Sequence, residues 1–157
     1  MAEALKEKVD LDGIDWAILA ELQEDSRISH AALGRRVHLT APAVAARIRK
    51  LQDAGVIRGF RVELGLPELG LEVLAFVRVR AESSRRSAFL EAVSDRHEVL
   101  ECHHVTGDDC CWVKVAARTM QHLDEVVEDL GCFGSTTTSV VFASRMVRRT
   151  VRQPAGG

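Results

Sequence analysis

In the first third of the chain, hydrophobic residues recur at the spacing of amphipathic helices. Ile14, Ile18 and Leu22 lie four residues apart and form one helical stripe, with Asp12 placed to cap it. Ser29 is a residue type that caps helices, and the apolar pattern resumes directly after it. The pattern therefore predicts two successive helices, the second ending near His38.

A third helix is predicted to begin after Thr40. Val44, Ile48 and Leu51 form its buried stripe, and Gly55 stands where a left-handed C-cap residue would end it. The second and third helices are joined by a tight turn of three residues, which is the arrangement of a helix-turn-helix.

After Gly55 the pattern changes to short strand-like runs. Residues 56–57 and 60–62 flank Arg58 and Gly59, and we expect them to pair as a small wing. Pro67 and Gly70 mark a boundary between domains. The pattern predicts a helix-turn-helix domain over residues 1–63, a linker over 64–70 and a second domain over 71–150.

The second domain alternates strand-like and helix-like segments in the order β-α-β-β-α-β, which is the ferredoxin-like motif. We predict an α+β fold: an N-terminal winged helix-turn-helix domain followed by a ferredoxin-like domain. One face of such a sheet carries helices and the other needs a cover, for which a second copy of the chain is the simplest candidate. The expected strands cover residues 71–79, 99–105, 111–116 and 136–142, and the expected helices surround Phe89 and follow Thr119 as far as Gly131.

Composition narrows the class of protein. Of the 157 residues 46% are hydrophobic and 28% charged, which is typical of a globular protein. The longest apolar run is far below the roughly 20 residues that cross a bilayer, and the first residues lack a secretory signal pattern. Four cysteines are too few for a disulfide framework. We therefore expect reduced thiols, no membrane association and a cytoplasmic location.

Charge is concentrated in the predicted helix-turn-helix. Residues 1–25 carry a net charge of −6, whereas residues 26–61 carry eight basic residues against Asp53, a net charge of +7. A block of this kind is typical of a surface that binds an anionic partner, although a solvated basic face would look the same. Together with the helix-turn-helix it favours double-stranded DNA as the partner.

The third helix would be the one that enters the major groove. With its stripe buried, Arg49, Ala45 and Ala46 would face base edges, and Arg47 and Lys50 would meet phosphates. Arginine can bond both acceptors of guanine, and alanine can contact the thymine methyl. The candidate DNA-binding residues are Ser29, Thr40, Pro42, Ala45, Ala46, Arg47, Arg49, Lys50 and Arg58.

Five segments stand out by their order and spacing: LDGIDWAIL at 11–19, residues 39–51, GVIRGF at 55–60, ECHHVTGD at 101–108 and TTTSVV at 136–141. Together they resemble the leucine-responsive and asparagine-regulator (Lrp/AsnC) family of transcription factors. The resemblance runs from Leu11 to about Arg149.

The resemblance implies a regulator, and not an enzyme, that needs no cofactor. It implies dimers formed through the sheets, assembly into octamers, and an amino acid or related metabolite as effector. An acidic side chain in the hairpin could hold the effector's ammonium group. The implied effector-binding residues are Val105, Thr106, Gly107, Asp108, Thr136 and Thr138.

The sequence also departs from the family pattern. His38 stands where the turn usually has glycine, and histidine tolerates the left-handed conformation better than most residues. Ala45 and Ala46 replace polar readers, which predicts modest base specificity and more weight on DNA shape. After Gly107 and Asp108 the family often continues with a second acid and an aromatic residue, whereas this chain has Cys110, Cys111 and Trp112. The effector could therefore differ or be absent.

Three other interpretations remain open. The first is an architectural DNA-binding protein without an effector. The second is a thiol or metal sensor at the cysteine and histidine cluster, although neighbouring strand residues point to opposite faces and cannot all converge. The third is a tetrapyrrole decarboxylase-like enzyme, for which no acid–base pair is fixed by the spacing. The cluster consists of Cys102, His103, His104, Cys110 and Cys111.

Overall fold

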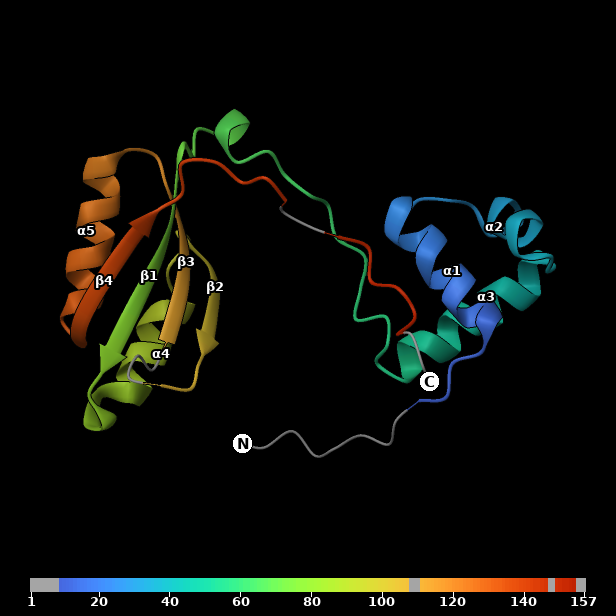
Figure 1. Ribbon diagram of the computed structural model, residues 1–157, viewed down its shortest axis with the longest axis horizontal. Helices are drawn as coiled ribbons and strands as arrows, with labels where there is room; N and C mark the ends of the chain where they lie inside the picture. Colours follow the sequence, from blue (N-terminus) through green and yellow to red (C-terminus); the bar gives the residue numbers. More distant parts are fainter. Residues whose placement is uncertain (1–8, 108–110, 147–148, 155–157) are drawn as a thin grey trace. The chain divides into compact units, whose positions relative to one another are not determined.

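The computed structural model describes residues 9–107, 111–146 and 149–154. The chain divides into two units (Figure 1), one made of Met1–Val62 with Met146–Gly157 and the other of Glu63–Arg145. The boundary thus falls just before the predicted linker, and the C-terminal residues belong to the first unit. Among the described residues, no helix is both long and apolar enough to cross a bilayer.

The first unit contains the three predicted helices, α1 (Gly13–Glu24), α2 (His30–Val37) and α3 (Ala41–Asp53). Their apolar stripes meet in one core, which removes the predicted buried positions from water. Seven residues form the centre of this core: Ile18, Leu22, Leu33, Val37, Val44, Ile48 and Leu51.

Local signals define the ends of these helices. The Ser29 hydroxyl accepts the Ala32 N–H at 3.2 Å and caps α2, whereas Thr40 stands at the N-cap of α3 without a capping hydrogen bond. His38 adopts the left-handed conformation with a φ of 56°, so the turn forms without a glycine there. Gly34 is needed instead, because an added Cβ would lie 2.4 Å from the Leu39 carbonyl oxygen.

The predicted wing is wrong. In the described chain no strand lies between α3 and the short 3-10 helix η1 (Pro67–Leu69). The N–H groups of Val56 and Ile57 both donate to the Leu51 carbonyl, at 2.9 and 3.1 Å, and their side chains pack on the helical core. Residues 56–57 therefore close the C-terminal end of α3 and have no strand partner.

Thr150 and Val151, near the C-terminus, are held on α1. The Gln23 side-chain amide donates to the Val151 carbonyl at 3.1 Å and accepts the Val151 N–H at 2.8 Å. The Thr150 hydroxyl donates to Glu24 at 2.8 Å. One side-chain amide thus bonds both backbone groups of a single residue, as a neighbouring strand would.

The second unit has the predicted β-α-β-β-α-β order. Its antiparallel sheet has the strand order β2-β3-β1-β4, which is that of the ferredoxin-like fold. The α+β class is therefore confirmed. The elements are β1 (Val73–Ala81), α4 (Arg86–Ser94), β2 (Val99–His104), β3 (Cys111–Ala117), α5 (Met120–Gly131) and β4 (Gly134–Val140), with a short 3-10 helix η2 (Ser83–Arg85) before α4.

Among the described residues, helices cover one face of the sheet (Figure 1). Phe89 of α4 is fully buried against the sheet and meets the ring of Phe133 edge to face at 5.8 Å. On the opposite face, which we call the open face, Phe76 and Trp112 are 37% and 42% exposed. An apolar core on one side and exposed aromatic rings on the other leave the sheet half covered.

Candidate nucleic-acid interface and effector region

The structure places α3 with its stripe of Val44, Ile48 and Leu51 in the core. The opposite side of the helix is exposed and includes Arg49 and Lys50. Within the described chain, neither of these two side chains has a hydrogen bond or ion pair. They are thus available to an anionic partner. Pro42 and Ala46 are exposed on the same helix, and Ala45 is half-buried.

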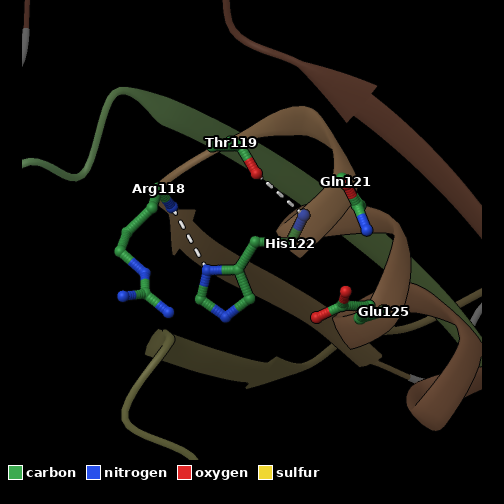
Figure 2. Close-up of a pocket in the computed structure, with 5 residues that line it drawn as sticks. All are labelled: Arg118, Thr119, Gln121, His122 and Glu125. Atoms are coloured by element: carbon green, nitrogen blue, oxygen red, sulfur yellow. Dashed lines mark hydrogen bonds between the residues drawn. The ribbon is translucent and has the colours of Figure 1, made fainter.

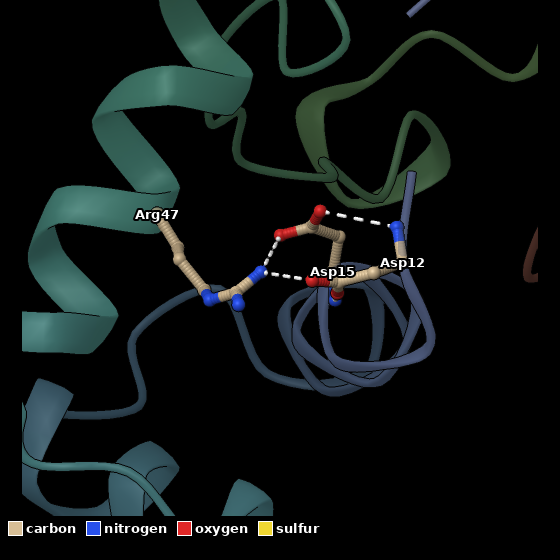
Figure 3. Close-up of polar contacts among 3 residues, drawn as sticks. All are labelled: Asp12, Asp15 and Arg47. Carbon is tan, nitrogen blue, oxygen red and sulfur yellow. Dashed lines mark hydrogen bonds and ion pairs between the residues drawn. The ribbon is translucent and has the colours of Figure 1, made fainter. Parts of the chain in front are cut away.

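Arg47 behaves differently from its neighbours on α3. Its guanidinium Nη1 donates to Asp12 Oδ2 and to Asp15 Oδ1, both at 2.7 Å (Figure 3). The Asp15 side chain is only 3% exposed, and that of Arg47 is 30% exposed. The arrangement turns Arg47 toward α1, and the phosphate contact expected from the sequence stays a prediction. Asp12, Asp15 and Arg47 form what we call the arginine–aspartate cluster.

The two carboxylates of the cluster also fix each other. The Asp15 N–H donates to Asp12 Oδ1 at 2.7 Å, and the Asp12 N–H donates to Asp15 Oδ2 at 3.3 Å, which completes a capping box on α1. The Asp15 N–H, followed by the Arg47 side chain, lowers the pKa of Asp12. Asp12, followed by Asp15, raises the pKa of Arg47. Both shifts favour the charged forms of Asp12 and Arg47 at neutral pH.

The other basic residues of the helix-turn-helix differ in exposure and in whether they form ion pairs within the domain. Arg36 forms an ion pair with Glu21 of α1 and is partly committed to the fold. Arg35 and Arg58 are exposed, and Ser29 caps α2 while remaining exposed. Sequence reasoning did not single out Arg35, which only its position in the basic block could have indicated.

The predicted effector residues come from two places at one end of the sheet. Pairing runs from His104 to Cys111, from Cys111 to Val79 and from Val79 to Thr136, so these four residues form one row across the strands. Thr136 therefore lies two strand spacings, about 10 Å, from Cys111 at the end of the β2–β3 turn, and three spacings from His104, where the turn begins.

Side-chain directions in that row separate the predicted residues further. Thr136 and Thr138 are paired with Val79 and Val77, whose side chains are buried on the helix-covered face, so the two threonines share that face. Thr106 and Gly107 are exposed at the hairpin, and Gly107 has a φ of 109°. Val105 is half-buried. Asp108 lies outside the described residues.

A hollow that sequence reasoning missed lies at the start of α5. It has a volume of about 350 Å³ and is lined by Arg118, Thr119, Gln121, His122 and Glu125 (Figure 2). None of the predicted effector residues lines it. His122 is fixed at both ring nitrogens, because Nδ1 accepts the Arg118 N–H at 3.3 Å and Nε2 lies 3.1 Å from Glu98 Oε1.

The two contacts hold the His122 ring between the Arg118 backbone N–H and the Glu98 carboxylate. The pKa of Glu98 is lowered by its own backbone N–H and then by His122. The pair ties the first turn of α5 to the start of β2. A histidine and a glutamate 24 positions apart give no local spacing signal, which is why the pattern could not reveal them.

The cysteine and histidine cluster is divided between the two sheet faces. Cys102 packs on the core, and Cys111 is buried in it. His103 pairs across the strands with Trp112 of the open face and lies 3.1 Å from Glu101. Within the described residues no three potential metal ligands come together. Cys110 lies outside those residues.

Comparison with known proteins gives the same division of the chain. A family model for the AsnC-type helix-turn-helix domain matches residues 11–52, and one for the Lrp/AsnC ligand binding domain matches residues 74–151. The HTH-type transcriptional regulator LrpA of Bacillus subtilis is 33% identical over 132 residues, which cover 83% of this chain and 97% of that protein. The chain belongs to the Lrp/AsnC family.

Solved structures of the family agree in fold. The structure of Bacillus subtilis LrpC has a TM-score of 0.85 at 27% identity and covers 89% of this chain and 100% of its own. A transcriptional regulator from Neisseria meningitidis in complex with L-Met has a TM-score of 0.83 at 28% identity and covers 94% of this chain and 98% of its own. This Lrp/AsnC family member is a DNA-binding transcriptional regulator with a helix-turn-helix and a ferredoxin-like ligand-binding domain.

Proposed function

We propose that this regulator binds DNA with a modest sequence preference, forms dimers that assemble further into octamers, and responds to an amino acid or a related small metabolite. The observation that carries the proposal is the exposed basic side of α3, held on the core of a helix-turn-helix. A helix supported in this way fits the major groove, where its side chains meet base edges and phosphates.

Within the DNA surface the roles differ. Arg49 reads bases, because it is exposed and can bond both acceptors of a guanine. Ala45 and Ala46 contribute shape and contact with thymine methyl groups. The surrounding polar and basic groups position the duplex through its phosphates: Ser29, Thr40, Lys50 and Arg58. Pro42 offers no donor to a phosphate and contributes apolar contact only. Arg47 is left out of this second set, because its guanidinium is engaged by two carboxylates.

The open face of the sheet supports dimer formation. Phe76 and Trp112 are exposed there side by side on neighbouring strands, since Phe76 pairs with Lys114 and Arg78 pairs with Trp112. Exposed aromatic side chains on a sheet are typical of an interface. A second copy offers the same surface and gives a closed two-fold pair.

An effector of amino-acid type is supported by the L-Met complex of the related regulator. For this chain we assign it to the β2–β3 hairpin, with Val105, Thr106, Gly107 and Asp108, and to the edge strand, with Thr136 and Thr138. The described hairpin residues Val105, Thr106 and Gly107 lie at the same end of the sheet as the threonines, but neither set lines the hollow at the start of α5. A second copy would have to complete the site.

The test combines ligand and DNA binding. The twenty amino acids are screened by thermal shift, because a ligand that binds only the native state raises the melting temperature. A hit is then tested for its effect on duplex binding by fluorescence anisotropy and on assembly size by light scattering. We expect one amino acid to raise the melting temperature and alter DNA affinity. A response that survives Thr106→Val and Thr136→Val unchanged would contradict the assigned site.

A second candidate function is an architectural DNA-binding protein without an effector. The short side chains of Ala45 and Ala46 on the reading helix favour it, because they provide no hydrogen-bonding readers. It predicts binding that is equally strong on unrelated duplexes and steep in salt, with no amino acid that shifts the melting temperature.

A further inference from the structure

We propose that Arg47 is a positioning residue of the DNA-binding surface. Through Asp12 and Asp15 it sets how α3 lies on α1, and thereby which side chains of α3 meet the bases. The inference rests on the proposed sequence preference and deepens it, because it names an internal contact on which the preference depends.

The first argument concerns which parts of the two helices the ion pairs connect. Arg47 belongs to the same helix as Arg49 and Lys50, yet its guanidinium points to the N-terminus of α1 (Figure 3). Asp12 is the N-cap residue of α1, and Asp15 lies in its first turn. The contacts therefore join the middle of the reading helix to the start of the helix that supports it.

The second argument is directional. Apolar packing between α1 and α3 is non-directional and tolerates small rotations of one helix on the other. Charge-assisted hydrogen bonds are short and directional, and here one Nη1 group serves two carboxylates at 2.7 Å each. A rotation of α3 about its own axis would lengthen both contacts. The arginine–aspartate cluster thus restricts the rotation of α3 on α1, which apolar packing alone would permit.

The third argument is that the acceptors are themselves held. Asp12 and Asp15 accept each other's backbone N–H groups in the capping box. Asp15 is nearly fully buried, and a buried carboxylate that loses its cation is strongly unfavourable. The carboxylates cannot follow a displaced Arg47, so the reference point on α1 is rigid.

The consequence concerns base readout. Arg49 and Lys50 follow Arg47 on α3 and move with any change in the orientation of the helix. Base readout requires a placement within roughly half an ångström, whereas phosphate attraction acts over several ångströms of solvent. A loosened α3 therefore loses sequence preference first and keeps its general affinity for duplex DNA.

This proposal and a phosphate-contacting Arg47 predict different measurements. If Arg47 meets a phosphate, Arg47→Met weakens binding to every duplex and reduces the slope of log K against log salt by about 0.9. If Arg47 positions α3, the slope stays the same and the preference falls. The second prediction extends to Asp15→Asn, a substitution that removes no positive charge.

The experiment uses the full chain and two duplexes. One is selected by the wild-type protein from a randomised pool, and the other is a scrambled duplex of the same composition. Affinities for both are measured at several salt concentrations for wild type, Arg47→Met, Asp15→Asn and the double variant. Arg36→Met is the matched control, because it removes an exposed arginine–glutamate ion pair between α2 and α1. Circular dichroism confirms that each variant is folded at the temperature used.

We expect the ratio of the two affinities to fall by about tenfold in each single variant, the worth of one lost base contact. The double variant should fall no further, because both changes break one cluster. Arg36→Met should retain the wild-type ratio. The proposal is overturned if Arg47→Met reduces the salt slope and keeps the ratio, or if Asp15→Asn keeps the ratio.

Two further outcomes are decisive. If Asp15→Asn unfolds, Asp12→Asn replaces it, because the exposed Asp12 carboxylate leaves no buried charge behind. An unchanged ratio in Asp12→Asn together with an unchanged ratio in Arg47→Met would refute the positioning role. If the wild-type protein selects no sequence from the pool, the proposed sequence preference has failed. This outcome differs from failure of the positioning role, in which the wild type prefers one duplex and the variants keep that preference.

Discussion

The two units of the chain build their functional surfaces in different ways. In the first unit the proposed DNA surface lies on one helix and its immediate neighbours, and local signals define that helix. In the second unit the proposed effector residues come from a hairpin and an edge strand separated by β3 and β1. A surface on one helix can be read from periodicity, whereas a surface spread across a sheet depends on register and on what completes it.

The largest expected effect is a loss of stability in the second unit, which distinguishes it from the first. Phe89→Ala removes a fully buried ring from the core of the second unit and should cost about 3–5 kcal/mol of its unfolding free energy. Differential scanning calorimetry should show a lower melting transition for that unit. A single shared transition that shifts as a whole would show that the two units unfold together.

A smaller effect is expected at the turn of the helix-turn-helix. Gly34→Ala places a Cβ 2.4 Å from the Leu39 carbonyl oxygen, so the turn must open, at a cost of about 1–3 kcal/mol. Duplex binding should weaken, and the calorimetric transition of the second unit should stay in place. Gly131→Ala is the matched control, since its added Cβ meets no atom within 4 Å.

The C-terminal segment offers a more modest test. Gln23→Ala removes both hydrogen bonds to Val151 and should release the segment from α1, a loss of about 1–2 kcal/mol in local stability. Limited trypsin digestion should then cleave after Arg149 and Arg152 faster than in the wild type. Gln121→Ala, on α5 of the other unit, should leave the cleavage rate unchanged.

The smallest effect is expected in acid. The pKa values of Glu98 and Glu101 are lowered from 4.5, the latter mainly by Lys114 and then by His103, and that of Asp12 is lowered from 3.8. Groups with lowered pKa values stabilise the folded state above their unfolded pKa, and this contribution is lost as pH falls through the folded value. Urea melts between pH 7 and pH 3 should show it, and Glu101→Gln should flatten the curve of the second unit.

The sequence predicted what local patterns control. The three N-terminal helices follow from apolar spacing and caps, and even the left-handed His38 was anticipated from its tolerance of that conformation. The β-α-β-β-α-β order of the second unit was also predicted, with strand ends shifted by about two residues, as expected where hydrogen-bond pairing sets the limits. The wing was predicted from strand-forming composition alone and is wrong, because Val56 and Ile57 bond back to Leu51.

Contacts between distant positions could not be predicted. Asp15 and Arg47 are 32 residues apart, and Gln23 and Val151 are 128 residues apart. No periodicity links such pairs. The sequence shows that Arg47 is positively charged, but it does not reveal whether the partner of that charge is a phosphate or a buried aspartate. The assignment of the effector residues stays a prediction for the same reason, because strand register alone does not bring them into one hollow.

The position of Val151 on α1 determines when the first unit can be completed during synthesis. The three helices leave the ribosome first and can pack at once, but the residue that occupies the Gln23 amide is made only after the whole sheet has been translated. The domain that is begun first is therefore finished last, and the ferredoxin-like unit is enclosed within its sequence as an insertion would be.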